Sequence, residues 1–230
     1  MPVKPPFQGA VLVETHAHTA EISPCSHLPA RRLARLAAEN GYGALVVTDH
    51  NLSGRTRTAG QCAAFARGYE LARRAGEKLG LTVLPGMELR FETHGCNDFL
   101  VFLPDPALYA LRGLPAMDPR AFKRLADERG MLVYQAHPFR PGLSAEPPEA
   151  LHGVEVYNGN PRHESRNALA RAYAREHGLA MLSGSDVHQE GDAGRGGIWA
   201  PKEALASPGA FVEYLRATPR PEMLTTDDDA

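Results

Sequence analysis

Short runs of apolar residues alternate along this chain with longer stretches in which apolar residues recur at helical spacing. The apolar runs have the length expected of buried strands and cover residues 10–13, 44–48, 81–84, 99–103, 131–135, 154–157 and 179–182. The periodic stretches predict helices over residues 28–40, 61–79, 118–130, 163–177 and 208–216. Strands that alternate with helices are typical of parallel sheets with right-handed crossovers. The pattern therefore predicts an α/β fold with about seven parallel strands.

The length of the chain indicates a single domain. Its 230 residues, 43% of them hydrophobic, are enough for one full core, and α/β barrels commonly reach this length undivided. No linker rich in glycine and serine divides the sequence. We assign residues 1–224 to one barrel domain and expect residues 225–230, which include three aspartates, to form a disordered acidic tail.

Charge and cysteine content exclude several classes of protein. The formal net charge is −2, so the chain lacks the positive charge typical of proteins that bind long nucleic acid, whereas a small phosphorylated substrate is compatible with it. Cys25, Cys62 and Cys96 lack the spacing of a disulfide framework, which favours a reducing compartment. We find no apolar targeting segment and no run long enough to span a bilayer. We therefore expect a cytoplasmic protein that does not bind membranes and predict no particular oligomeric state.

The first apolar run leads into a pair of histidines, His16 and His18. Alternate residues of a strand point to the same face, so both imidazoles would stand side by side at the end of this strand. Two imidazoles in this arrangement can bind one metal ion, although a His-x-His sequence also arises by chance. The other strand ends decide between these interpretations.

Several later apolar runs also end in residues that bind metals. His50 follows the second run, Glu88 the third and His137 the fifth. Asp186 and His188 follow the last run and repeat the i, i+2 spacing of the first histidine pair. In an α/β barrel the carboxyl ends of the strands meet at one mouth, where these side chains would lie together. Five strand ends of this kind predict a metal centre at that mouth.

The predicted ligands are imidazoles and carboxylates without thiolates, which suits Zn²⁺, Mn²⁺ or Fe²⁺. Asp49 is adjacent to His50 and would point away from it on a regular strand, so we expect Asp49 to orient a ligand from behind. The sequence contains neither the glycine pattern that binds dinucleotides nor the P-loop pattern. Neither type of nucleotide site is therefore indicated.

The order of these motifs resembles that of the PHP family (polymerase and histidinol phosphatase). The resemblance extends from about residue 11 to residue 197 and rests on five motifs: His16-Ala17-His18, Thr48-Asp49-His50-Asn51, Gly86-Met87-Glu88, Ala136-His137-Pro138 and Gly184-Ser185-Asp186-Val187-His188. Amidohydrolases also begin with His-x-His on a first barrel strand, but they lack the second and last of these motifs. The resemblance implies a distorted (β/α)₇ TIM-like barrel with two or three divalent metal ions, Zn, Mn or Fe, at its mouth.

The resemblance also implies how the ligands are shared among the metal ions. The first ion would be surrounded by His16, His18, Glu88 and Asp186. Glu88 would bridge to a second ion that His137 also holds, and His50 and His188 would hold a third. Among these residues we assign catalytic roles to Glu88, Asp186 and His188.

The chain departs from the family pattern at two positions. Many members have a histidine just before the strand that follows the Gly-x-Glu motif, whereas this chain has Asn97 and Asp98 there. A carboxylate binds hard or borderline metals as well as an imidazole does, so we expect Asp98 to be a ligand, with His94 as the alternative. Members also carry an Asp or His in the loop after the first motif. In this chain Glu21 or Cys25 would have to substitute, and we favour Glu21.

Three residues outside the metal ligands are predicted to bind substrate. Arg140 lies shortly after the fifth apolar run, and Arg195 lies in the glycine-rich loop near the C-terminus. Either guanidinium would clamp a phosphate, the alternative being a solvated surface residue. Asn158 ends a strand at the same mouth and would support substrate or a metal ligand. His163 and His177 fall in a predicted helix, where we expect them to be exposed.

These features predict a metal-dependent phosphoesterase, similar to histidinol phosphatase, that hydrolyses a small phosphomonoester. Metal ions would lower the pKa of a water so that hydroxide attacks phosphorus in line, and an arginine would stabilise the phosphoryl oxygens. One alternative is a 3′→5′ exonuclease or other phosphodiesterase acting on nucleotides or short nucleic acid. The other is a non-catalytic PHP module that serves as an interaction domain. The near-neutral charge weighs against the first alternative, and the nearly complete ligand set weighs against the second.

Overall fold

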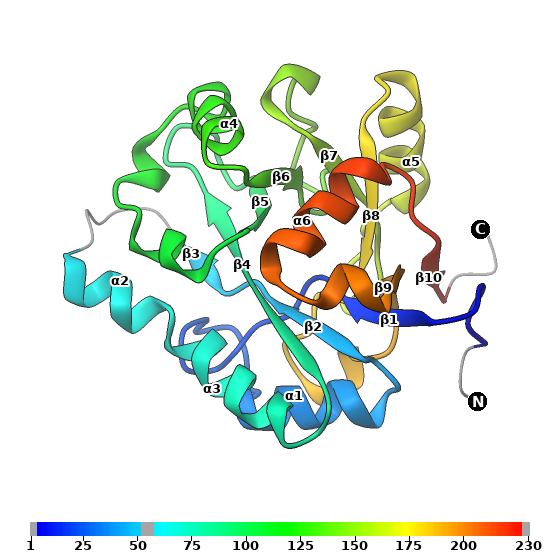
Figure 1. The fold of residues 1–230 in the computed structure, drawn as a ribbon. Helices are drawn as coiled ribbons and strands as arrows, with labels where there is room; N and C mark the ends of the chain where they lie inside the picture. Colours follow the sequence, from blue (N-terminus) through cyan, green and yellow to red (C-terminus); the bar gives the residue numbers. More distant parts are fainter. Residues whose placement is uncertain (1–3, 52–57, 227–230) are drawn as a thin grey trace.

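The computed structural model describes residues 4–51 and 58–226, and these residues form one mixed sheet of ten strands. The strands are β1 (Ala10–Glu14), β2 (Ala44–Val47), β3 (His50–Asn51), β4 (Thr82–Arg90), β5 (Asp98–Phe102), β6 (Leu132–Gln135), β7 (Gly153–Asn158), β8 (Ala180–Gly184), β9 (Gly196–Pro201) and β10 (Met223–Thr225). Their order is β10-β9-β1-β2-β4-β5-β6-β7-β8, and β3 pairs with β4 beside this path. The sheet curves into a nearly closed barrel, so the predicted distorted barrel is confirmed (Figure 1).

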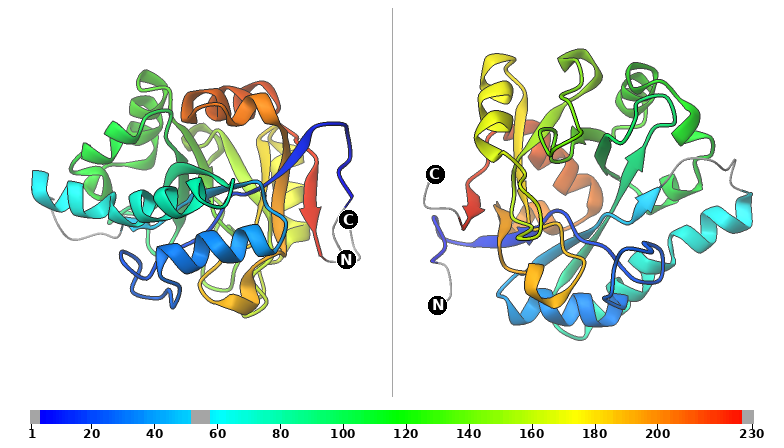
Figure 2. Two further views of the ribbon diagram at one scale, coloured as in Figure 1. Left: turned by 60° about the horizontal axis from the view of Figure 1, so that its bottom comes forward. Right: turned by 180° about the vertical axis from the view of Figure 1, so that it is seen from behind.

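Helices surround the barrel on its outside and cover one of its ends (Figures 1 and 2). The helices are α1 (Ala30–Glu39), α2 (Ala59–Phe65), α3 (Arg67–Glu77), α4 (Pro119–Glu128), α5 (Asn167–Glu176) and α6 (Pro208–Ala217). Short 3₁₀ segments lie at Pro106–Ala110, Leu114–Ala116, Pro148–Ala150, Glu190–Asp192 and Lys202–Leu205. None of the helices in the described part of the chain is long and apolar enough to cross a membrane.

The prediction of an entirely parallel sheet is wrong at two places. Strands β1, β2 and β4 are parallel to one another, as are β6, β7 and β8, but β5 is antiparallel to both of its neighbours. Only residues 91–97 join β4 to β5, and a parallel crossover needs a longer connection. Strand β9 also runs antiparallel to β1. Because β5 is reversed, its first residue, Asp98, lies at the same end of the barrel as the carboxyl ends of the parallel strands.

Two serine hydroxyls join β8 to the strands at the other edge of the sheet. The Ser183 hydroxyl donates to the carbonyl oxygen of Leu224 at 2.6 Å and accepts from the amide of Gly197 at 3.0 Å. The Ser185 hydroxyl accepts from the amide of Gly196 at 2.8 Å. These bonds link β8 to β9 and β10 where the barrel would otherwise have an open seam.

Apolar side chains pack both inside and outside the barrel. The inner cluster includes Val46, Leu100 and Leu182, and α6 joins it through Phe211, whose ring centroid lies 6.1 Å from that of Phe102. The outer cluster lies between the strands and α1, α3, α4 and α5. Burial of this apolar surface is the main stabilising contribution to the fold. Helix α6 closes the end at which β5 finishes, so the opposite end is left for the polar strand termini.

The single helix predicted over residues 61–79 is divided in the structure. Helix α2 ends at Phe65, whose ring packs 5.7 Å from that of Tyr109, and α3 begins at Arg67 after a break at Ala66. Helix α3 packs closely at Gly68, where a Cβ atom would come within 2.3 Å of the Asp49 carboxylate. The break lets the two helices meet different neighbours, which the apolar periodicity alone does not reveal.

The C-terminal boundary also differs from the prediction. Thr225 belongs to β10, and the amide of Thr226 donates to the hydroxyl of Tyr157 at 2.9 Å. The expected tail at residues 225–230 therefore does not include Thr225 and Thr226, because these two threonines pair with the barrel. Residues 227–230 lie outside the described part of the chain.

Candidate metal centre

The first and last ligand motifs are held side by side by an isolated parallel bridge between Ala17 and Val187. The amide of His18 donates to the Val187 carbonyl at 3.0 Å, and the Val187 amide donates to the His16 carbonyl at 3.0 Å. Residues on either side of each bridging residue then face the same way. The i, i+2 spacing of both motifs therefore produces one combined set of four side chains.

The carboxylate of Glu88 lies at the centre of this set. Its Oε2 atom is 3.4 Å from His16 Nε2, 3.3 Å from His18 Nε2 and 3.0 Å from His50 Nδ1. Its Oε1 atom is 3.3 Å from His137 Nε2. The two oxygens face different imidazoles, which is the arrangement expected of a carboxylate that bridges two metal ions.

Asp186 forms a second centre beside Glu88. Its Oδ1 atom is 3.4 Å from both His16 Nε2 and His18 Nε2 and 3.3 Å from His188 Nδ1. Among the described residues, potential ligand atoms form four groups of three, and within each group the atoms lie within 4.8 Å of one another. The groups are His16, His18 and Glu88; His16, His137 and Asp186; His18, His50 and His188; and His50, Glu88 and Asp98. The predicted convergence of the motif residues is therefore present in the structure.

Several of these atoms are buried without a hydrogen-bond partner among the described residues. They are His16 Nε2, His18 Nε2, His50 Nδ1 and both carboxylate oxygens of Glu88. Leaving buried polar atoms without partners costs free energy, and native proteins rarely do so without a ligand or ordered water. Divalent cations bound within the cluster would satisfy these atoms, so the residues fit a site for more than one metal ion.

Burial and neighbouring charges set the protonation of the cluster. Burial favours the protonated form of both carboxyls, but the neighbouring imidazoles outweigh it and hold the pKa of Glu88 and of Asp186 well below its usual range. Burial, together with the repulsion of two imidazoles, holds the pKa of His18 well below its usual range. Burial also acts on His16, but carboxylates led by Asp186 outweigh it and raise the pKa of His16 well above its usual range. Metal binding would displace this proton.

The backbone is strained at two of the predicted ligands. His137 has a φ of 28° and Asp186 a φ of 57°, both in the left-handed region that side chains other than glycine rarely adopt. Gly184 leads into the second of these positions, and a Cβ atom there would come within 2.6 Å of the Cβ of His16. Strain of this kind persists only where the surrounding structure over-determines it, and it clusters at functional sites.

Glu155 supports two of the ligands from behind, a role that the sequence analysis missed. Its Oε1 atom lies 2.8 Å from His16 Nδ1, and its Oε2 atom accepts from the amide of His137 at 2.9 Å. A carboxylate bonded to one imidazole nitrogen fixes the tautomer and leaves the other nitrogen to face a metal. The signal available in the sequence was an acidic residue within the apolar run 154–157.

Glu14 is a second buried carboxyl that the sequence analysis missed. Its Oε1 atom accepts from the amide of His16 at 3.1 Å and from the amide of Ser185 at 2.9 Å. Burial raises the pKa of Glu14 to about 7, although these hydrogen bonds oppose the shift. Glu14 thereby fastens the end of β1 to the end of β8 beneath the cluster.

Comparisons with known proteins show a related family model and similar folds. Residues 164–218 match the family described as PHP-associated. The fold is similar to that of a two-domain protein from Bacteroides vulgatus containing a predicted PHP-like metal-dependent phosphoesterase. The similarity has a TM-score of 0.61 at 20% identity and covers 89% of this chain and 66% of that one. The predicted resemblance to the PHP family is confirmed.

Two further solved structures share this PHP-like fold. PsfC from Pseudomonas syringae has a TM-score of 0.67 at 18% identity, with 95% of this chain and 93% of that one covered. An amidohydrolase from Chromobacterium violaceum with bound sulfate and no metal has a TM-score of 0.56 at 16% identity, with 94% of this chain and 98% of that one covered. No curated protein matches the sequence.

Asp49 lies behind the cluster of predicted ligands, as expected for a residue that orients ligands. Its carboxylate accepts from the amide of Thr19 at 2.6 Å and from the hydroxyl of Ser23 at 2.7 Å. The same Ser23 hydroxyl accepts from the amide of His50 at 3.0 Å and lies 3.5 Å from His18 Nδ1. Asp49 therefore acts on two ligands through Ser23.

Asp98 faces the cluster, whereas His94 does not. Asp98 shares a group of ligand atoms with His50 and Glu88, and Arg90 holds both of its oxygens at 2.7 and 2.6 Å. His94 instead lies 2.8 Å from the hydroxyl of the adjacent Thr93 and points to a different carboxylate. The structure thus favours Asp98 over His94, and the role of Asp98 as a ligand stays a prediction.

The preference for Glu21 over Cys25 is wrong. The Glu21 carboxylate accepts from the amide of Ala30 at 2.8 Å and so caps the start of α1, where Pro29 supplies no side-chain cap. Cys25, by contrast, lines the mouth. Burial raises the pKa of its thiol, but hydrogen bonds with His188 and His50 outweigh burial and lower the pKa to about 6.

A cavity of about 380 Å³ opens over the cluster, and we call it the mouth. Arg140 lines the mouth as predicted, but its Nη2 atom donates to Asp186 Oδ2 at 2.6 Å and to Asn158 Oδ1 at 2.7 Å. Asn158 donates to Asp186 Oδ2 at 3.3 Å, so it supports a ligand. Arg195 does not line the mouth but a neighbouring groove, where it donates to the Gly191 carbonyl oxygen at 3.2 Å, and its role in substrate binding stays a prediction.

His163 reaches the mouth although the sequence placed it in an exposed helix. The predicted helix over residues 163–177 begins only at Asn167, because Arg166 takes a φ of 51°. His163 therefore lies in the loop before α5 and lines both the mouth and the neighbouring groove. His177 lies at the end of α5 and is exposed, as predicted.

Proposed function

We propose that this chain is a cytoplasmic metal-dependent phosphoesterase that hydrolyses a small phosphomonoester. The observation that carries the proposal is the position of Glu88 among His16, His18, His50 and His137, with buried nitrogen and oxygen atoms that have no other partner among the described residues. The name of the similar two-domain protein from Bacteroides vulgatus supports metal-dependent phosphoesterase chemistry.

We assign the ligands to two or three divalent ions, which would be Zn²⁺, Mn²⁺ or Fe²⁺. The first ion would be held by His16, His18, Glu88 and Asp186. Glu88 and His137 would share a second, and His50 and His188 a third. Divalent ions held by such ligands polarise phosphoryl oxygens and generate a hydroxide-like nucleophile from water at neutral pH.

The chain's own residues keep the ligand atoms in place for this chemistry. The Glu155 carboxylate holds the Nδ1 edge of His16, so the Nε2 edge faces the cluster. Arg140 and Asn158 hold Oδ2 of Asp186, so its Oδ1 atom points to the histidines. Pre-positioned ligands need no reorganisation when substrate arrives, which is the main requirement of electrostatic catalysis.

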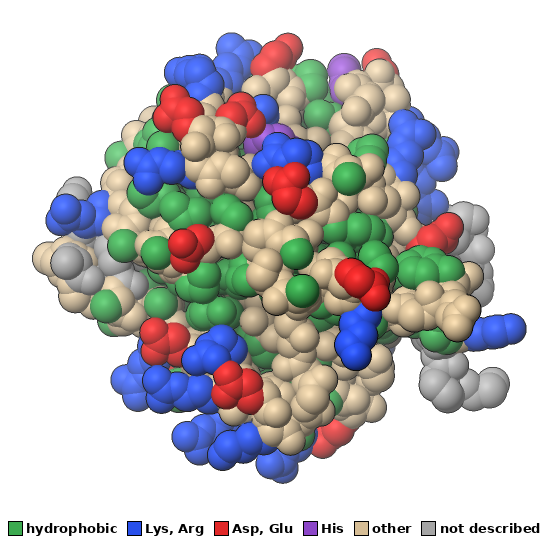
Figure 3. Space-filling view, in the orientation of Figure 1, with side chains coloured by type: hydrophobic (Ala, Val, Ile, Leu, Met, Phe, Trp, Pro, Cys, Tyr) green, Lys and Arg blue, Asp and Glu red, His purple; other side chains and the backbone are tan. Residues whose placement is uncertain are grey.

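The size of the mouth supports a small substrate over long nucleic acid. Its volume of about 380 Å³ lies within the range typical of small-molecule sites. On the face drawn in Figure 3, the basic side chains among the described residues form separate groups interrupted by acidic ones. A backbone of nucleic acid would instead favour a continuous basic track.

Metal analysis combined with a substrate panel tests the proposal. We expect at least two equivalents of transition metal in protein purified without chelator, and hydrolysis of phosphomonoesters such as p-nitrophenyl phosphate. Preferential hydrolysis of bis-p-nitrophenyl phosphate or of short oligonucleotides would favour the phosphodiesterase alternative, and hydrolysis of amides alone would favour amidohydrolase chemistry. Less than one equivalent of metal, even after incubation with Mn²⁺ or Zn²⁺, would contradict the proposal.

A further inference from the structure

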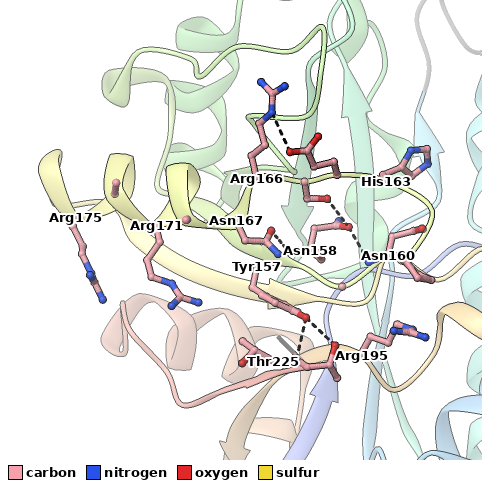
Figure 4. A pocket seen from close by; sticks show the side chains of 17 residues that line it. Tyr157, Asn158, Asn160, His163, Arg166, Asn167, Arg171, Arg175, Arg195 and Thr225 are labelled. Carbon is pink, nitrogen blue, oxygen red and sulfur yellow. Dashed lines mark hydrogen bonds and ion pairs between the residues drawn. The ribbon is translucent and has the colours of Figure 1, made fainter. Parts of the chain in front are cut away.

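A groove of about 640 Å³ lies beside the mouth, and the proposed chemistry does not use it. Its walls are α5 with the loop before it, the loop before β9 and the end of β10 (Figure 4). His163 lines both cavities, so the groove and the mouth adjoin. Asn160 lines the groove and donates to the carbonyl oxygen of Asp186 at 2.8 Å, which places the groove one residue away from a metal ligand.

The groove carries a surplus of positive charge. Among the described residues, four arginines line it, against one acidic residue, Glu164. Arg166 lies 3.8 Å from Glu164 and points away from the other arginines, so this pair neutralises itself. Figure 4 shows Arg171 and Arg175 extending from the same side of α5, whereas Arg195 lies beyond Tyr157, near Thr225, with its guanidinium directed away from α5. A concave surface with charge of one sign concentrates the field and attracts ligands of opposite charge.

The arginines of the mouth are paired with carboxylates, whereas two of those in the groove have no acidic partner among the described residues. In the mouth, Arg90 pairs with Asp98, and Arg140 pairs with Asp186, each at 2.6 Å. Arg162 likewise pairs with Asp192 at 2.9 Å. Two arginines of the groove differ from these: Arg175 of α5 and Arg195 of the loop before β9. Among the residues that the structure describes, no carboxylate forms an ion pair with either of them.

Other polar groups of the groove, among them Tyr157 and Asn167, are bonded within the protein. The Tyr157 hydroxyl accepts from the amide of Thr226, and the Asn167 side chain accepts from the amide of Asn158 at 3.0 Å. These groups shape the walls and leave recognition to the guanidinium groups. Guanidinium binds phosphate or carboxylate through two parallel hydrogen bonds, so the expected ligand is an anion of this planar or tetrahedral type.

We propose that this groove binds a second anionic group, phosphate or carboxylate, on the same substrate whose phosphate ester reaches the metal ligands. The inference rests on the proposed function and adds a substrate class, namely phosphomonoesters with two anionic groups. One molecule would occupy both sites because the cavities adjoin and because no carboxylate among the described residues pairs with Arg175 or Arg195.

A kinetic comparison of three esters tests the substrate class. Glycerol 2-phosphate has one anionic group, 3-phosphoglycerate adds a carboxylate, and fructose 1,6-bisphosphate adds a phosphate. We expect kcat/KM at least tenfold higher for one or both esters with two anionic groups, chiefly through a lower KM. The double variant Arg175→Gln/Arg195→Gln should reduce this preference at least tenfold. The matched control, Arg73→Gln/Arg74→Gln on α3, should keep it.

A binding measurement separates failure of the groove from failure of the proposed function. Calorimetric titration of metal-free protein with inorganic phosphate should give a Kd that rises at least tenfold in the groove variant and is unchanged in the α3 control. If the groove variant binds phosphate more weakly but the wild-type enzyme hydrolyses none of the esters, the groove is supported as an anion site. That result would overturn only the phosphoesterase assignment. The inference drawn from the groove would be overturned if the enzyme hydrolysed all three esters with similar kcat/KM. It would also be overturned if the groove variant kept both the preference for a second anionic group and the wild-type Kd for phosphate.

Discussion

The guanidinium of Arg140 lies 2.6 Å from the carboxylate of Asp186, between Nη2 and Oδ2. The same nitrogen donates to Asn158 Oδ1 at 2.7 Å. An arginine that the sequence identified as a phosphate clamp therefore already holds a buried metal ligand. A basic residue near a metal-binding motif can therefore hold a metal ligand in position instead of binding the substrate.

Replacement of Arg140 should destabilise the metal-free protein. Arg140→Gln removes the guanidinium that pairs with the buried carboxylate of Asp186, and breaking a buried pair in this way typically costs on the order of 3 kcal/mol. Urea unfolding of the metal-free variant would measure this loss. Arg120→Gln is the matched control, because Arg120 pairs with Glu149 at the surface and such pairs contribute little. Equal unfolding midpoints for both variants would contradict a supporting role for Arg140.

Glu88→Gln should reduce turnover by orders of magnitude while the fold is retained. The substitution keeps the shape of the side chain but removes the negative charge that faces His50 and His137 from its two oxygens. A neutral amide is a poor bridge between two cations, so metal content should fall as well. Elemental analysis and steady-state kinetics, with circular dichroism to monitor the fold, measure these effects. A fully active and metal-replete variant would rule out the bridging assignment, and the exposed Glu128→Gln provides the control.

Glu155→Gln should weaken metal binding by about 10- to 100-fold, the usual effect of losing a residue that orients a ligand. The amide can still fill the space but no longer provides a charged acceptor for His16 Nδ1. Metal affinity measured by competition with a chromogenic chelator checks the prediction. Glu155→Asp, which keeps the charge but shortens the reach, should fall between the wild type and Glu155→Gln. Unchanged affinity in both variants would show that Glu155 has only a structural role.

The ligand motifs were predictable from the sequence because they follow strands whose ends must meet. His16 and His18 could be placed together by the two-residue period of a strand, and the barrel then brought distant motifs to one mouth. Glu155 was not predictable in the same way, since it lies inside a strand instead of after it. Its function depends on which face of β7 turns toward His16, and strand register is decided by tertiary packing.

Other errors arose where short local features override the average pattern. The reversed direction of β5 depends on the length of the loop at residues 91–97. The late start of α5 depends on the left-handed conformation of Arg166, which brings His163 to the mouth and the following arginines into the groove. Glu21 was expected at the metals, but an uncapped helix start nearby offered its carboxylate a stronger local partner in the amide of Ala30.

Asp98→Ala should lower metal occupancy and activity more than His94→Ala does. Asp98 lies with Glu88 and His50 at the mouth, whereas His94 is bonded to its neighbour Thr93 outside the cluster. Metal analysis and activity of the two variants, prepared in parallel, measure the difference. Because Arg90 also binds Asp98, Arg90→Gln tests whether an effect of Asp98→Ala comes from the metal or from loss of this pair. The reverse ranking of the two alanine variants would show that the imidazole is the ligand.

His152 should make the stability of the fold sensitive to mild acid, independently of the metal ligands. Its Nδ1 atom accepts from the amide of Val133 at 3.0 Å, and its Nε2 atom lies 2.8 Å from the Asp127 carboxylate. Burial lowers the pKa of His152 from 6.5, and the charge of Lys123 lowers it further, although Asp127 opposes the shift. Protonation would remove the lone pair that accepts from Val133, so the folded state binds this proton less readily than the unfolded state.

The sign of the effect follows from this difference in proton affinity. The contribution of neutral His152 is fully present above pH 6.5 and is lost as the pH falls from 6.5 through the lowered pKa of the folded state. The histidines of the metal centre also titrate in acid, so the test compares two proteins and not two pH values alone. His152→Gln should be less stable than the metal-free wild type at pH 7.5, because the bond to Val133 is weakened, but its urea midpoint should decrease less between pH 7.5 and 5.5. Parallel pH dependences for the two proteins would show that the acid sensitivity comes from other groups.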